Sequence, residues 1–126
     1  MRRAIDTATA PKPIGPYSQA IDTGGLVFCA GQIGLDPTTG RLVEGGVAAE
    51  ADQAIRNLTA VLAAVGLTLA HVVKTTLFLV DLNDGPALGA IYGKAFPSPY
   101  PARSTVQVAA LPAGARVELE AIAVRR

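Results

Sequence analysis

Residues 101–121, PARSTVQVAALPAGARVELEA, contain two apolar runs joined by a short linker. Both runs have the length and the composition of β-strands. The linker from 111 to 115 contains Pro112 and Gly114, which favour a turn. The stretch therefore predicts two neighbouring strands that pair as an antiparallel hairpin.

Charged side chains interrupt both of these predicted strands. Because side chains alternate along a strand, Arg103, Thr105 and Gln107 are expected on one side of the first strand. Glu118 and Glu120 are expected to share one side of the second strand. A charge on an otherwise apolar strand belongs either to a solvated face or to a site, so both readings stay open for Arg103 and Glu118.

Two helices are predicted upstream of this stretch. Apolar residues at helical spacing predict a helix at 47–65, which ends at Gly66 in a Schellman motif. A second helix begins after Asn83 or Asp84, each able to act as its cap, and ends before Pro97. The apolar stripe of this second helix consists of Leu88, Ile91, Tyr92 and Ala95.

The remaining predicted strands give the fold class. They lie at 17–22, 26–34 and 71–81, and residues 2–6 can add another. Gly31, inside a strand pattern, indicates a bulge or a close backbone approach. The order β-β-α-β-α-β-β predicts an α+β fold in which both helices cover one face of a mixed sheet.

Residues 1–126 are expected to form one domain. Half of the residues are hydrophobic and only 17% are charged, which suggests that surface is buried between subunits. A second copy of the chain is the simplest cover for the other face of the sheet. A net charge of +1 and six aromatic residues argue against a nucleic-acid partner.

The chain offers few groups for metal or thiol chemistry. One cysteine, Cys29, excludes an intrachain disulfide, and one histidine, His71, leaves too few ligands for a zinc site. Cys29 is expected to be a buried, inert thiol and His71 a surface residue. Neither a secretory signal nor a membrane-spanning run is recognisable, so a cytoplasmic location is the default expectation.

Seven motifs follow one another along the chain. They are IGPYSQA at 14–20, AGQI at 30–33, DPTTG at 36–40, VKTT at 73–76, DLND at 81–84, PARS at 101–104 and ELEAIAVR at 118–125. Together they resemble the RidA/YjgF family of enamine and imine deaminases, also described as endoribonuclease L-PSP or translation inhibitors. The resemblance implies a chorismate-mutase-like fold and a homotrimer. The sheets of that trimer would form a central barrel, with three sites in the clefts between subunits.

The resemblance also implies a chemistry. Members of this family hydrolyse reactive enamines and imines that carry a carboxylate, such as 2-aminoacrylate, to 2-oxo acids and ammonia without a cofactor. Arg103 matches the arginine that binds the substrate carboxylate, a task suited to a planar guanidinium with paired donors. Glu118 matches the glutamate near the attacking water, and both residues are expected to be catalytic. The expected substrate-binding residues are Tyr17, Ala30, Gly31, Arg103 and Thr105.

Three positions depart from the family pattern. Many relatives have serine at Ala30, cysteine at Thr105 and asparagine near Gly89. The carboxylate clamp is unchanged, but the pocket around it is altered. Two alternatives to the deaminase therefore stay open. One is a regulatory trimer that binds small carboxylates with little or no catalysis. The other is an endoribonuclease or translation inhibitor, which the near-neutral charge and sparse aromatic residues disfavour.

Overall fold

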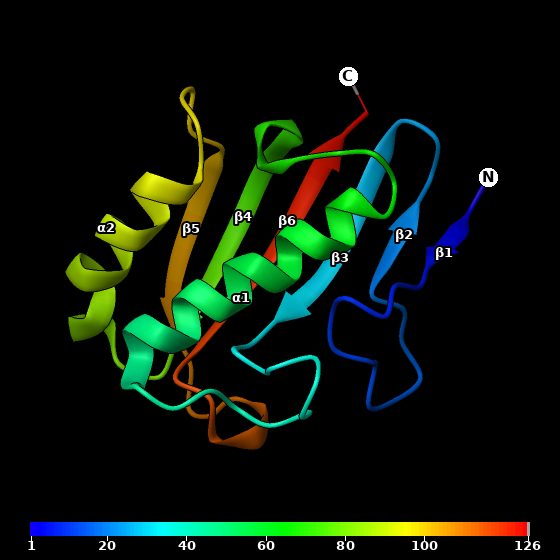
Figure 1. Ribbon diagram of the computed structural model, residues 1–126. Helices are drawn as coiled ribbons and strands as arrows, with labels where there is room; N and C mark the ends of the chain where they lie inside the picture. Colours follow the sequence, from blue (N-terminus) through cyan, green and yellow to red (C-terminus); the bar gives the residue numbers. More distant parts are fainter. Residues whose placement is uncertain (126) are drawn as a thin grey trace.

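A computed structural model describes residues 1–125, which form a six-stranded sheet and two α-helices (Figure 1). The strands are β1 (Arg3–Ile5), β2 (Ala20–Asp22), β3 (Leu26–Gln32), β4 (Val72–Leu79), β5 (Ala102–Gln107) and β6 (Val117–Val124). The helices are α1 (Gly46–Ala63) and α2 (Gly85–Ala95). The order of elements confirms the prediction, including the additional strand near the N-terminus.

The sheet is mixed, as predicted. Its strand order is β1-β2-β3-β6-β4-β5, and β4 and β5 form the parallel pair while the other neighbours are antiparallel. Helix α2 connects the parallel strands, which need a crossover of this kind. Both helices lie on the same face of the sheet (Figure 1). This arrangement confirms the predicted α+β class with two helices on one face.

The predicted C-terminal hairpin is wrong. β6 lies between β3 and β4, whereas β5 pairs only with β4, at the edge of the sheet. The physical reason is burial: Val117, Leu119, Ala121 and Ala123 of β6 are almost fully buried, whereas most side chains of β5 are exposed. A strand with such a buried apolar face gains most at the centre of the sheet. The linker therefore crosses the end of β4 instead of making a tight turn.

Helix α1 ends as the sequence predicts. Gly66 has a φ of +76°, the left-handed conformation that favours glycine. The Leu67 amide donates to the Leu62 carbonyl at 3.0 Å, and the Gly66 amide donates to the Ala63 carbonyl at 3.0 Å. These two bonds define a Schellman motif. The apolar stripe of α1 packs over β3 and β6 and forms the core with α2.

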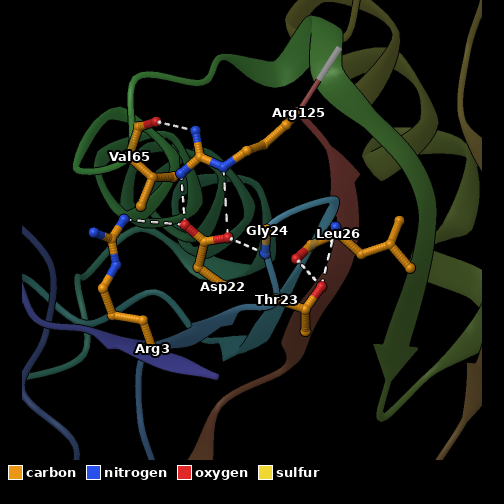
Figure 2. A network of polar contacts seen from close by, with 7 residues as sticks. All are labelled: Arg3, Asp22, Thr23, Gly24, Leu26, Val65 and Arg125. Atoms are coloured by element: carbon orange, nitrogen blue, oxygen red, sulfur yellow. Dashed lines mark hydrogen bonds and ion pairs between the residues drawn. The ribbon is translucent and has the colours of Figure 1, made fainter. Parts of the chain in front are cut away.

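A buried carboxylate joins the ends of the chain. Asp22 accepts hydrogen bonds from the guanidinium groups of Arg3 and Arg125 and from the amide of Gly24 (Figure 2). Arg125 also donates to the carbonyl of Val65, just beyond α1. The Arg125 guanidinium is the main cause that lowers the pKa of Asp22 to about 2. The network therefore holds β1, β2 and the end of β6 together while Asp22 is ionised.

The face of the sheet opposite the helices is open and partly apolar. Phe28 is 44% exposed and Val106 40% exposed, and both lie on this face with Glu118 and Glu120. Such an exposed apolar surface is typical of an interaction site. Within residues 1–125, no helix is long and apolar enough to cross a membrane.

Candidate active site

A cavity of about 340 Å³ lies where β3, β6 and the proline-rich loop before β2 meet. It brings together four of the residues that the family resemblance singles out. They are Tyr17, Ala30, Gly31 and Glu118. The cavity wall is mostly apolar, and Glu118 provides its carboxyl group. An apolar cavity with one carboxyl group suits a small, partly polar ligand.

Gly31 makes the room that the Glu118 side chain occupies. A β-carbon on Gly31 would lie only 2.0 Å from Oε2 of Glu118. The β3–β6 register shifts between Cys29 and Gln32, which confirms the bulge predicted at Gly31. The close backbone approach predicted there is also present. The bulge and the missing side chain together place the Glu118 carboxyl directly against the β3 backbone.

The environment of Glu118 favours its protonated form. Burial is the main cause that raises the pKa of Glu118, and the negative charge of Glu120 on the same face adds to the effect. A carboxyl group with a raised pKa can hold a proton closer to neutral pH than an ordinary glutamate. Such a group can serve as a general acid or base.

Arg103 lies at a second cavity, of about 420 Å³, between β5 and α2. Its guanidinium carbon lies 4.8 Å from the centre of the Tyr92 ring, a cation–π contact. Gly89, Gly93 and Tyr100 are among the other residues that line this cavity. Among residues 1–125, the Arg103 guanidinium makes no hydrogen bond or ion pair. Its donors are therefore available to an incoming carboxylate.

The strand register separates Arg103 from Glu118. Arg103 pairs with Thr75 of β4, and Thr75 pairs with Ala121 of β6, three residues from Glu118. Thr75 contacts α2, so Arg103 faces the helices, whereas Glu118 lies on the open face. The backbone positions of Arg103 and Glu118 are about 10 Å apart across the strands and about 10 Å apart along them. A single chain therefore does not bring the guanidinium and the carboxyl group to one ligand.

Thr105 follows Arg103 on the same side of β5, as predicted, since it pairs with the buried Leu77. It lines neither of the cavities described above in the part of the chain that the structure describes. Glu118 and Glu120 share the open face, as the alternation predicts. Cys29 is buried, as predicted, and burial raises the pKa of its thiol to about 12, which disfavours the reactive thiolate.

The sequence pattern does not predict the contact of Tyr92 with Arg103. The helical pattern places Tyr92 in the apolar stripe of α2, which is correct, because its ring is buried. Its contact with Arg103 depends on where α2 crosses β5, and no local pattern encodes that crossing. Within residues 1–125, no group of three His, Cys, Asp or Glu side chains is placed to hold a metal ion.

Comparison with known proteins extends over nearly the whole chain. The profile of a family described as endoribonuclease L-PSP matches residues 7–125. A human protein named 2-iminobutanoate/2-iminopropanoate deaminase is 50% identical over 125 residues, which cover 99% of this chain and 91% of the human one. A Myxococcus xanthus protein named DfrA is 53% identical over 125 residues, which cover 98% and 95% of the two chains.

Solved structures agree with this similarity. RidA from a Psychrobacter species superposes with a TM-score of 0.94 at 44% identity, covering 98% of this chain and 99% of the other. Escherichia coli TdcF, solved with bound serine, gives a TM-score of 0.93 at 40% identity, with coverage of 98% and 99%. The strand order and helix placement are therefore those of known folded proteins.

Proposed function

Since the chain belongs to the RidA/YjgF family, whose profile is described as endoribonuclease L-PSP, we propose that it is an imine deaminase that acts on small carboxylate-bearing imines and enamines. The products are a 2-oxo acid and ammonia. The observation that carries the proposal is the Glu118 carboxyl, which has a raised pKa and forms part of the wall of an apolar cavity. The human relative at 50% identity carries the name of a deaminase for two such imines.

The reaction needs proton transfers at each step. An enamine first takes a proton on carbon and becomes an imine. Water then adds to the imine carbon, so that oxygen bonds to carbon and one proton passes to nitrogen. The proton of the new hydroxyl then passes to nitrogen, and the carbon–nitrogen bond breaks so that ammonia leaves as the carbonyl forms.

Glu118 is suited to carry these protons. As a base it accepts a proton from the attacking water, and as an acid it returns that proton to the nitrogen. The raised pKa reduces the free-energy difference between the ionised and the protonated form of Glu118 near neutral pH. Proton transfer by a well-placed group contributes about 10²–10⁴-fold to a rate.

Arg103 is the proposed carboxylate clamp. Its guanidinium has donors that no group of residues 1–125 occupies, and two parallel hydrogen bonds fix both the position and the orientation of a carboxylate. The bound serine of the Escherichia coli relative also carries a carboxylate, which supports a site for small amino-acid-like ligands in this family. A fixed carboxylate leaves the imine carbon in one place for water to attack.

The separation of Arg103 and Glu118 within one chain supports a site that is shared between chains. We propose a homotrimer in which Arg103 of one copy and Glu118 of another face the same substrate. The open sheet face, with its exposed Phe28 and Val106, supports such an assembly. Ala30, Gly31 and Tyr17 would then line the site with Glu118, and Thr105 would join from the side of Arg103. A single domain at 1–126 and a cytoplasmic location remain predictions.

A second candidate function rests on Ala30. This residue lines the cavity of Glu118 and lacks the hydroxyl that many relatives are expected to have there. A trimer that binds small carboxylates with little catalysis would tolerate that loss.

One experiment separates the two functions. Purified protein is added to a dehydratase that converts serine or threonine to 2-aminoacrylate or 2-aminocrotonate, and release of the 2-oxo acid is followed. A deaminase accelerates release, and Arg103→Ala abolishes the acceleration while the oligomer persists. Binding of 2-oxobutanoate by calorimetry without any acceleration would instead support the regulatory trimer.

A further inference from the structure

We propose that Tyr92 is a positioning residue, which holds the Arg103 guanidinium in the orientation that receives the substrate carboxylate. The inference rests on the proposed function, because it takes Arg103 as the carboxylate clamp. Tyr92 lies in α2, outside the motifs that carry the family resemblance. A set of contacts around its ring fixes the Tyr92 side chain beside Arg103.

Contacts at its hydroxyl and along its ring fix the Tyr92 side chain. Tyr92 is only 5% exposed, and its hydroxyl shares a buried hydrogen bond of 2.8 Å with the Thr75 hydroxyl. Phe96 stacks against the ring with the centroids 4.2 Å apart and the planes 24° from parallel. These contacts prevent the rotations that an unpacked tyrosine side chain would make, so the ring stays in one position.

The anchor of the ring is also the neighbour of Arg103. Thr75 is the residue of β4 that pairs with Arg103 of β5. The backbone register thus sets the position of Arg103 relative to Thr75, and the hydroxyl pair sets the position of the ring relative to Thr75. The Arg103 guanidinium carbon then lies 4.8 Å from the ring centre. The strand pairing and the hydroxyl pair therefore both place the Tyr92 ring next to the Arg103 guanidinium.

This arrangement suits carboxylate binding. The Arg103 guanidinium carbon lies over the Tyr92 ring, and the Tyr92 hydroxyl is paired with Thr75 instead of with Arg103. The Tyr92 contact therefore restrains Arg103 without a hydrogen bond that would compete with a ligand. An exposed arginine loses rotamer freedom when it binds a ligand, and a restraint that exists beforehand reduces that loss.

The test compares three substitutions in the assembled protein. Tyr92→Leu removes the ring, Tyr92→Phe keeps the ring and removes the hydroxyl, and Leu88→Ala is the matched control. Leu88 is 2% exposed in the same helix, so its truncation weakens the same core. Tyr92→Met replaces Tyr92→Leu if the leucine variant does not fold, as judged by circular dichroism.

Calorimetry with 2-oxobutanoate measures ligand binding without turnover. We expect Tyr92→Leu to weaken binding by about threefold to tenfold, the range of a partly exposed cation–π contact, and to raise KM similarly with little change in kcat. Tyr92→Phe should weaken binding less than Tyr92→Leu, because it retains the ring and its stacking on Phe96 and loses only the hydroxyl bond to Thr75. Leu88→Ala should lower the melting temperature and leave binding unchanged.

Two outcomes would overturn the inference. One is equal binding by the Tyr92→Leu and Leu88→Ala variants. The other is a loss on Tyr92→Leu that is just as large in an Arg103→Ala background, since a residue that acts through Arg103 has nothing to add there. Failure of the proposed function looks different: the wild type would show no acceleration, or Arg103→Ala would bind 2-oxobutanoate as well as the wild type.

Discussion

The contact between Gly31 and Glu118 gives the sharpest single-residue prediction. In Gly31→Ala the new β-carbon would lie 2.0 Å from Oε2, 2.7 Å from Cδ and 2.9 Å from Cγ of Glu118. Ordinary van der Waals contact begins at 3.4 Å, so the carboxyl oxygen must move by about 1.4 Å. Gly31 does not have a positive φ, so alanine meets no backbone strain there. The substitution acts on the position of the carboxyl group.

The expected result is a loss of catalysis with little loss of stability. A side chain pushed from its rotamer costs about 0.5–1.5 kcal/mol, so Gly31→Ala should fold. A displacement of about 1 Å at a reacting group can cost about 100-fold in rate, so kcat should fall by about that factor. Binding of 2-oxobutanoate through Arg103 should change far less.

The assay follows 2-oxo acid release from enzymatically generated 2-aminocrotonate, with calorimetry and thermal unfolding on the same samples. Gly25→Ala is the matched control, because a β-carbon there meets nothing within 4 Å. It should keep the wild-type kcat. A wild-type kcat in Gly31→Ala would contradict this prediction, since it would mean that the position of the Glu118 carboxyl does not matter for the reaction.

Two further predictions concern substrate range and acid stability. Gly89→Asn should fold normally, since a β-carbon at 89 meets nothing within 4 Å, and should fill part of the cavity beside Arg103. KM should then rise for imines with large side chains relative to 2-aminoacrylate, and an equal change for both would contradict this. The folded-state pKa of Asp22, about 2, is below its ordinary value of 3.8, so its contribution to stability is present above pH 3.8 and is lost as pH falls toward 2. Urea unfolding should show a weaker pH dependence for Asp22→Asn than for the wild type in this window, and parallel curves would contradict the assignment.

Local patterns predicted most of the elements. The apolar spacing of α1 and the Gly66 stop depend on residues close in sequence, and both are confirmed. The bulge at Gly31 is likewise a local feature of β3. Such features follow from side-chain periodicity and backbone preference alone.

Strand order could not be predicted in the same way. The two apolar runs at 101–121 looked adjacent because a short linker joins them, yet β6 pairs with β3 and β4. To choose between a β5–β6 hairpin and a central β6, one must know which side chains the complete folded sheet buries. The same non-local packing places Arg103 and Glu118 on opposite faces of the sheet and Tyr92 under Arg103. The candidate residues came from the sequence, and their spatial relation came from the non-local packing.

Complementation between two inactive variants tests directly whether Arg103 and Glu118 of different copies form one site. Arg103→Ala and Glu118→Gln are each expected to lose deaminase activity as pure oligomers. If Arg103 of one copy works with Glu118 of another, unfolding and refolding an equimolar mixture creates some sites with both native residues. Random assembly would then restore up to about one quarter of the wild-type activity. Mixed oligomers, verified by mass spectrometry, that remain inactive would contradict the shared site.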